Sequence, residues 1–229
     1  MNEAATRGQP MTSLGTRALW TAAALSLIAG VTDVTSWVLL GGFFSAHVTG
    51  NLVVLAADVV ASRRPSPSGV LAIPIFIVVV AVATAVGRAS AALRKRGFVP
   101  LLFVQTALLT TAAALSFTTT ASADPTAPLA VIIGMCAVAA MATQNAYLHL
   151  IPGKVFTTAV MTGNLVAATM AAVDLLRTRG LDPEVRQRWI TTWPLLVGFV
   201  AGCLAGALAD PRRRHGPGRP RAARFAPSQ

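Results

Sequence analysis

The chain has 229 residues, of which 54% are hydrophobic and 12% are charged. A typical soluble domain carries about 25% charged residues, so this composition is incompatible with an ordinary water-exposed surface. The formal net charge of +11 does not indicate nucleic-acid binding, because the basic residues gather at the ends of apolar runs and in the tail, where anionic lipid headgroups would bind them.

Long apolar segments follow one another along the chain and predict an all-α fold, a polytopic transmembrane helical bundle. Each segment has about the 20 residues that a helix needs to cross a bilayer. The flanking tails, 1–16 and 210–229, are polar and are expected to be disordered, and the second is rich in Arg. The seven expected spans cover residues 18–40, 43–61, 70–93, 98–119, 129–151, 155–176 and 189–209.

A five-residue motif occurs twice and indicates an internal duplication. Thr-Gly-Asn-Leu-Val stands at residues 49–53 and again at 162–166, and a Gly-containing break precedes each copy. Small residues spaced by four recur as well, a pattern that lets transmembrane helices approach closely. We therefore expect helix packing at Gly87 in the first half and, in the second half, at Gly198, Gly202 and Gly206.

The repeat predicts two three-helix units, residues 17–96 and 129–209, joined by a connector helix and loop at 97–128. One connecting span between two units of three would make both units enter the membrane in the same direction, so the expectation is a parallel duplication. The distribution of Arg and Lys only weakly favours an outside N-terminus. An arrangement with six spans, in which one segment is re-entrant or crosses only in part, stays open.

Polar residues inside the apolar spans are the candidate solute-binding residues. Asp33 stands out, because a carboxylate near the middle of a span costs several kcal/mol unless it is paired, hydrated or protonated. The alternatives are structural: Asp33 would bond Asn51 or a nearby Thr, the amides would join helices, and each Asn of the repeated motif would cap a helix start. The candidate set is Asp33, Asn51, Gln144, Asn145 and Asn164.

Other polar residues are assigned to the membrane edge. Asp58 and Asp174 lie close to Arg63 and Arg177 in the sequence, and we expect ion pairs there. His47 is interpreted as an interfacial polar residue, with a response to pH as the alternative.

The sequence favours neither an enzyme nor a metal or cofactor site. It contains no HExxH, GxSxG, Walker or GxGxxG motif. Cys136 and Cys203 lie in apolar runs without metal-ligand or redox spacing, and they are expected to behave as small apolar residues.

Three separated motifs in the first half resemble the YoaK family of bacterial inner-membrane proteins, also called domain of unknown function 1275. They are Gly-Val-Thr-Asp at 30–33, Leu-Gly-Gly-Phe-Phe at 40–44 and Val-Thr-Gly-Asn at 48–51. Gln144-Asn145, Thr157-Thr158 and the second Thr-Gly-Asn are similar to the second half of that family. The resemblance covers about residues 18–209 and implies a multi-pass protein of the bacterial inner membrane without a defined activity.

The functional expectation is a small-solute transporter or exporter, with the polar residues of the two units facing a central cavity. The alternative is a non-transporting membrane scaffold or stress-response partner, which predicts a dry interior and tight glycine contacts. The expected partners are anionic lipid headgroups, an unknown small solute and a second copy of the chain as a homo-oligomer, without nucleic acid.

Overall fold

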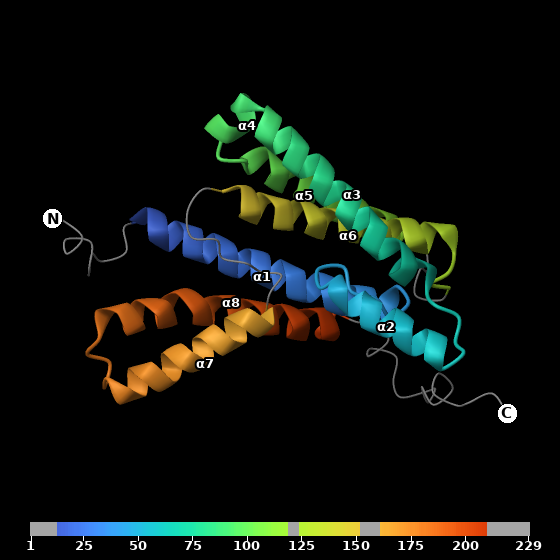
Figure 1. Ribbon diagram of the computed structural model, residues 1–229. Helices are drawn as coiled ribbons and strands as arrows, with labels where there is room; N and C mark the ends of the chain where they lie inside the picture. The colour runs from blue at the N-terminus through green and yellow to red at the C-terminus, as the bar shows by residue number, and fades with distance from the viewer. Residues whose placement is uncertain (1–12, 119–123, 152–160, 210–229) are drawn as a thin grey trace.

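The computed structural model describes residues 13–118, 124–151 and 161–209. Residues 1–12 and 210–229 of the predicted tails lie outside this part of the chain, whereas residues 13–16, expected to be disordered, belong to the first helix. All regular elements in these ranges are α-helices (Figure 1). Five of the described helices, α1, α3, α5, α6 and α8, are long and apolar enough to cross a membrane. The helices are α1 (Ser13–Leu39), α2 (Thr49–Val60), α3 (Pro67–Ala89), α4 (Ala91–Lys95), α5 (Val99–Phe117), α6 (Pro128–Leu150), α7 (Met161–Arg177) and α8 (Pro183–Leu208).

The expected second span at 43–61 is not a continuous transmembrane helix. Residues 43–48 are non-helical, and α2 has only 12 residues. At about 1.5 Å per residue it is roughly 18 Å long, well short of the bilayer's hydrocarbon core of about 30 Å. The expected sixth span at 155–176 begins outside the described residues, and its described part is α7, with 17 residues.

The segment between α1 and α3 enters and leaves the bundle at the same end. A Cβ atom added to Gly41, just after α1, would lie 3.1 Å from Ser66 Oγ, just before α3, and 3.1 Å from Pro125 Cβ, just before α6. The end of α1 and the starts of α3 and α6 therefore share one end of the bundle. Figure 1 shows α2 running back toward that end, so residues 42–65 fold back on the bundle as a hairpin, which we call the re-entrant hairpin.

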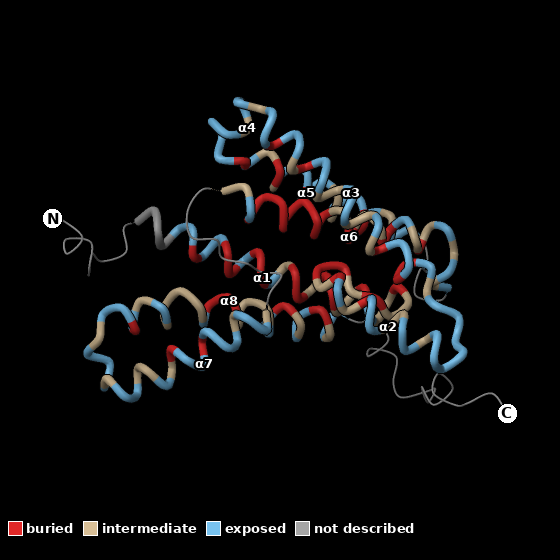
Figure 2. The backbone as a smooth tube through the Cα atoms, in the orientation of Figure 1, coloured by how far each residue is buried: buried red, intermediate tan, exposed pale blue. Residues whose placement is uncertain are grey.

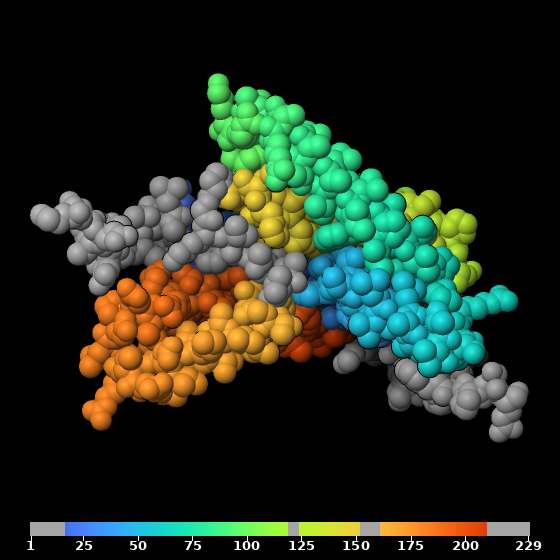
Figure 3. All heavy atoms as spheres, viewed as in Figure 1, coloured from blue at the N-terminus to red at the C-terminus, as the bar shows by residue number. Residues whose placement is uncertain are grey.

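At the opposite end of the bundle lie the ends of α3 and α6 and the starts of α1 and α5. Gly87 of α3 lies beside Leu150 of α6 and Phe98, which precedes α5. Leu19 and Ala22 of α1 share a core cluster with Leu195 of α8. The helix α7 packs along α8, and the end of α6 and the first part of α8 both lie at this end of the bundle. Figure 3 shows α2 and α7 at the surface, α2 against α3 and α7 against α8.

Helix directions contradict the expected parallel duplication. The side chain of Gln144 bonds to the backbone of Leu25, whereas Met141 packs near Ala29, so α6 runs antiparallel to α1. These are the first helices of the two expected units. The two expected units therefore point in opposite directions.

The core lies along α1 and α6, and the outer helices face outward with apolar side chains. Residues 140–148 of α6 form a continuous buried run, as the red part of the tube in Figure 2 shows. By contrast, Phe103 of α5 and Ile77 of α3 are 72% and 61% exposed. Apolar exposure of this extent suits contact with lipid acyl chains, and the chain is an integral, multi-pass membrane protein.

Helices α1 and α8 pack closely and in parallel because their contact is built on glycine. Cβ atoms added to Gly198 and Gly202 would lie only 2.5 Å and 2.1 Å from the carbonyl oxygens of Ala23 and Leu27. The third expected glycine, Gly206, faces α1 in the same way at Val31. The tight glycine contact therefore lies within one chain.

Candidate functional site

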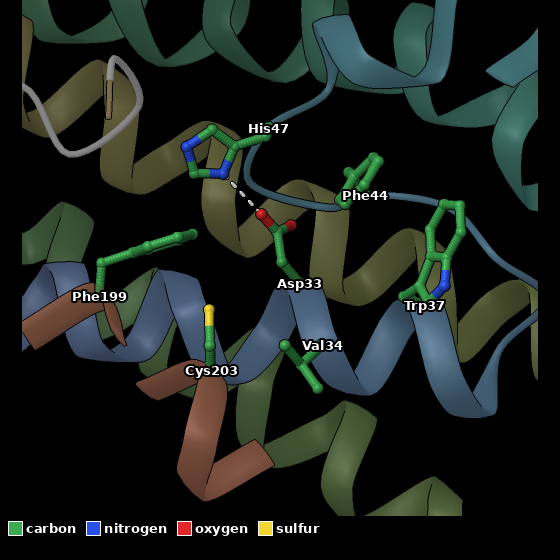
Figure 4. Close-up of a pocket in the computed structure, with 7 residues that line it drawn as sticks. All are labelled: Asp33, Val34, Trp37, Phe44, His47, Phe199 and Cys203. Atoms are coloured by element: carbon green, nitrogen blue, oxygen red, sulfur yellow. Dashed lines mark hydrogen bonds and ion pairs between the residues drawn. The ribbon is translucent and has the colours of Figure 1, made fainter. Parts of the chain in front are cut away.

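The side chain of Asp33 holds the loop that follows α1. Its Oδ1 accepts hydrogen bonds from the backbone N–H groups of Ser45 and Ala46 at 2.9 and 2.7 Å and from the Ser45 hydroxyl at 3.4 Å. Its Oδ2 lies 2.6 Å from Nδ1 of His47 (Figure 4). The residue is only 4% exposed, so these contacts replace the water that a carboxylate would otherwise need. The prediction that Asp33 would bond Asn51 or a nearby Thr is therefore wrong, because groups of the loop at residues 45–47 contact both oxygens of the carboxylate.

The first Asn of the repeated motif fixes the same loop from the other side. Oδ1 of Asn51 accepts from the backbone N–H of Phe44 at 2.8 Å, and its Nδ2 donates to the Phe44 carbonyl at 2.8 Å. Asn51 is fully buried, and α2 has no side-chain cap at its start. Asn51 is therefore a clamp on the loop rather than a helix cap.

Two glycines let the chain turn back into the bundle after α1. Gly41 has a φ of 103° and Gly42 a φ of 79°, a region that side chains with a Cβ atom rarely adopt. The turn brings His47 beside Asp33, fourteen positions earlier in the sequence. The Gly-Gly break is thus the local cause of the contact between the acid and the imidazole.

A cavity of about 360 Å³ lies beside this pair. Its volume is at the lower end of the range of about 300–1,000 Å³ that is usual for small-molecule sites. The walls come from α1, from the non-helical part of the re-entrant hairpin at residues 43–48, and from α8 (Figure 4). The lining residues are Asp33, Val34, Trp37, Phe44, His47, Phe199 and Cys203.

Aromatic rings stand on both sides of the carboxylate. Trp37 and Phe44 stack with ring centroids 4.9 Å apart, and His47 meets Phe199 edge-on at 5.0 Å. Nε2 of His47 is buried and has no hydrogen-bond partner among the described residues. The cavity therefore combines apolar aromatic walls with one acid and one imidazole.

The amides of α6 lie in a separate polar layer. Nε2 of Gln105 on α5 donates to Oε1 of Gln144 at 2.7 Å, and Nε2 of Gln144 donates to the Leu25 carbonyl on α1 at 3.1 Å. Asn145 donates to the Met141 carbonyl at 2.9 Å within its own helix. Neither amide of α6 lines the cavity, and Gln144 joins three helices.

The second Asn of the repeated motif lies elsewhere. Asn164 is half-buried near the start of α7, with its Nδ2 3.9 Å from Sδ of Met161. The residues that precede α7 lie outside the described part of the chain, Thr157 and Thr158 among them. Of the five predicted site residues, Asp33 and Asn51 both hydrogen-bond to the loop that precedes α2. Among these five, only Asp33 lines the cavity.

Several lining residues escaped the sequence analysis. His47 was assigned to the membrane edge, although the Gly-Gly break before it signals a chain reversal that would return it to α1. Phe199 and Cys203 carry no sequence signal, because their place depends on how α8 packs on α1. The ion pair of Asp58 with Arg63 is confirmed at 2.9 Å, and the pair of Asp174 with Arg177 stays a prediction.

Comparison with known proteins gives one match. Neither the curated proteins nor the solved structures include a match to this chain. The family model described as "Protein of unknown function (DUF1275)" matches residues 21–216, which is most of the chain. This match confirms the resemblance seen in the motifs, and its description assigns no activity. The chain therefore belongs to the DUF1275 family.

Proposed function

We propose that the protein is a small-solute transporter or exporter of the bacterial inner membrane, with its solute site in the cavity beside Asp33. The cavity is the observation that carries the proposal, because it places a buried carboxylate next to space for a ligand. Ionisable residues inside membrane segments are costly and commonly mark solute or ion pathways.

The helix arrangement supports this proposal. We interpret α1–α3 and α6–α8 as two inverted copies of one unit, since α1 packs on α8 as α6 packs on α3, and α1 and α6 are antiparallel. Many transporters consist of inverted repeats with broken helices at the substrate site. The cavity fits this plan, because its walls are α1 and the loop of the first unit and α8 of the second.

A transport assay tests the proposal. Purified protein in liposomes should move at least one solute from a panel of small metabolites, and Asp33→Asn should abolish the movement. Asn keeps an oxygen that can accept from Ser45 and Ala46 but carries no charge. The control is Asp58→Asn, which removes an acid paired with Arg63 outside the cavity and should leave transport intact.

A negative result in two assays would end the proposal. It is wrong if no candidate solute moves and Asp33→Asn also complements a deletion strain as fully as the unaltered protein does.

One observation favours the rival function, a membrane scaffold or stress-response partner. The hydrogen bonds of Asp33 and Asn51 all end on the loop, so both residues would lock the fold even without a solute. A scaffold needs no water-filled route to the cavity. Chemical labelling of cavity residues therefore separates the two functions.

A further inference from the structure

The charges around the cavity are unequal. Among the residues that the structure describes, its lining contains one acidic side chain, Asp33, and no Lys or Arg. The other lining groups that can titrate are His47 on the loop and Cys203 on α8. With a neutral imidazole, these described lining side chains carry one net negative charge. With an imidazolium at His47, the contact of 2.6 Å to Asp33 becomes an ion pair and the net charge is zero.

The aromatic walls complement this charge. Trp37, Phe44 and Phe199 come from three different elements, and the rings lie on two sides of the space beside the carboxylate (Figure 4). Aromatic faces attract cations, most strongly when the cation has lost its water. A carboxylate acts over a longer range in an apolar surrounding than in water, so it attracts a cation even without direct contact.

We infer that the cavity takes an organic cation with an apolar or aromatic body, and that this cation competes with a proton on His47. The inference rests on the proposed transport function and names the class of solute. The exchange balances in charge: one cation enters and one proton leaves the imidazolium. A transporter with such a site would exchange protons for cations.

An anionic solute fits less well. The residues that lead into α2 form the positive end of a helix, which by itself would favour an anion. However, the backbone N–H groups of Ser45 and Ala46 already bond to Asp33. An anion would have to displace that carboxylate and would meet no Lys or Arg among the described lining residues.

Three probes of similar size test the inference on the purified full-length protein. They are benzyltrimethylammonium, its neutral carbon isostere neopentylbenzene, and the anion phenylacetate. Binding is measured from about pH 5 to 8, the range in which imidazole side chains change charge. We expect the ammonium to bind at least tenfold more tightly than the other two probes. Its affinity should rise toward tenfold per pH unit on the acidic side of the titration, with up to one proton released per cation bound.

Variants assign this behaviour to residues. Asp33→Asn should weaken binding of the ammonium at least tenfold, and His47→Gln should remove the pH dependence while binding remains. If Asp33→Asn does not fold, Trp37→Leu gives a second test, because it removes an aromatic wall and should weaken binding of the ammonium. Phe103→Leu is the control, since Phe103 is an exposed ring of α5 outside the cavity, and it should bind like the unaltered protein.

Other outcomes would overturn the inference. Equal binding of the ammonium and its neutral isostere would show a purely apolar site, and tighter binding of phenylacetate would show an anion site. Both results leave the proposed transport function standing. If no probe binds, the cation inference is wrong, and the liposome assay with Asp33→Asn decides separately whether the transport proposal also fails.

Discussion

Asn51 and Phe44 exchange two hydrogen bonds of 2.8 Å each, so the helix α2 holds the loop that leads into it. On the α1 side of this loop, the Asp33 carboxylate accepts hydrogen bonds from the backbone N–H groups of Ser45 and Ala46. These two side chains together fix the position of His47 and Phe44 in the cavity wall. The fully buried amide is thus a structural support of the candidate site.

Replacement of Asn51 should destabilise the protein in steps. Asn51→Ala takes the hydrogen-bond partner from the partly buried backbone N–H and carbonyl of Phe44, at a cost of up to about 1–3 kcal/mol for each group. Asn51→Asp keeps an acceptor for the Phe44 N–H but sets a carboxylate oxygen against the Phe44 carbonyl at a fully buried position, so its loss should be at least as large as that of Asn51→Ala. Thermal unfolding in detergent checks this order, and equal stability of Asn51→Ala and the unaltered protein would contradict it.

Replacing each of the three α8 glycines by alanine should push α1 and α8 apart. The loss of stability should be larger where the added Cβ atom lies closer to α1. The added Cβ atom would lie 2.1 Å from the Leu27 oxygen at Gly202, 2.5 Å from the Ala23 oxygen at Gly198, and 3.1 Å from the Val31 oxygen at Gly206. Overpacking of this kind typically costs about 1–3 kcal/mol. We expect the largest loss of unfolding free energy for Gly202→Ala and the smallest for Gly206→Ala. A reversed order would contradict the described contact.

The inverted arrangement makes a prediction about sidedness. Single cysteines at positions 62, 96 and 179, in a chain with Cys136→Ser and Cys203→Ser, are labelled in sealed vesicles with an impermeant maleimide. The re-entrant hairpin places 96 and 179 on one side and 62 on the other. A parallel seven-span bundle would instead place 62 with 179, opposite to 96.

The polar layer between α5 and α6 should show energetic coupling. A double-mutant cycle with Gln105→Leu and Gln144→Leu removes the hydrogen bond of 2.7 Å between these side chains. Such pairs in membrane proteins average about 0.6 kcal/mol and reach about 1.7 kcal/mol. We expect a coupling of this size from unfolding by SDS, and strictly additive losses would contradict a direct bond.

Hydropathy predicted where helices form but not how often the chain crosses the membrane. Residues 43–61 have the apolar length of a span whether they cross the bilayer or enter and return. The difference lies at Gly41 and Gly42, whose positive φ angles turn the loop back toward Asp33. The first helices of the two expected units, α1 and α6, run antiparallel, and hydropathy alone did not predict this direction.

The sequence predicted one residue of the candidate site, Asp33, but not the residues that reach the cavity only through packing between distant helices. Asp33 stands out because an acid in an apolar run is costly, and this signal is local. Phe199 and Cys203 are ordinary residues of an apolar helix, and only the close packing of α8 on α1 brings them to the cavity. Long-range packing of this kind leaves no mark on neighbouring residues in the sequence.

Water access to the cavity tests the central claim most directly. Val34→Cys, in the chain with Cys136→Ser and Cys203→Ser, places one thiol in the cavity wall, and Ala29→Cys places one in the packed face of α1 as the control. Transport predicts that an impermeant cationic methanethiosulfonate modifies position 34 from both faces of sealed vesicles and that benzyltrimethylammonium slows the reaction, while position 29 stays protected. Equal protection of positions 34 and 29 from both faces would contradict the account and favour a closed scaffold.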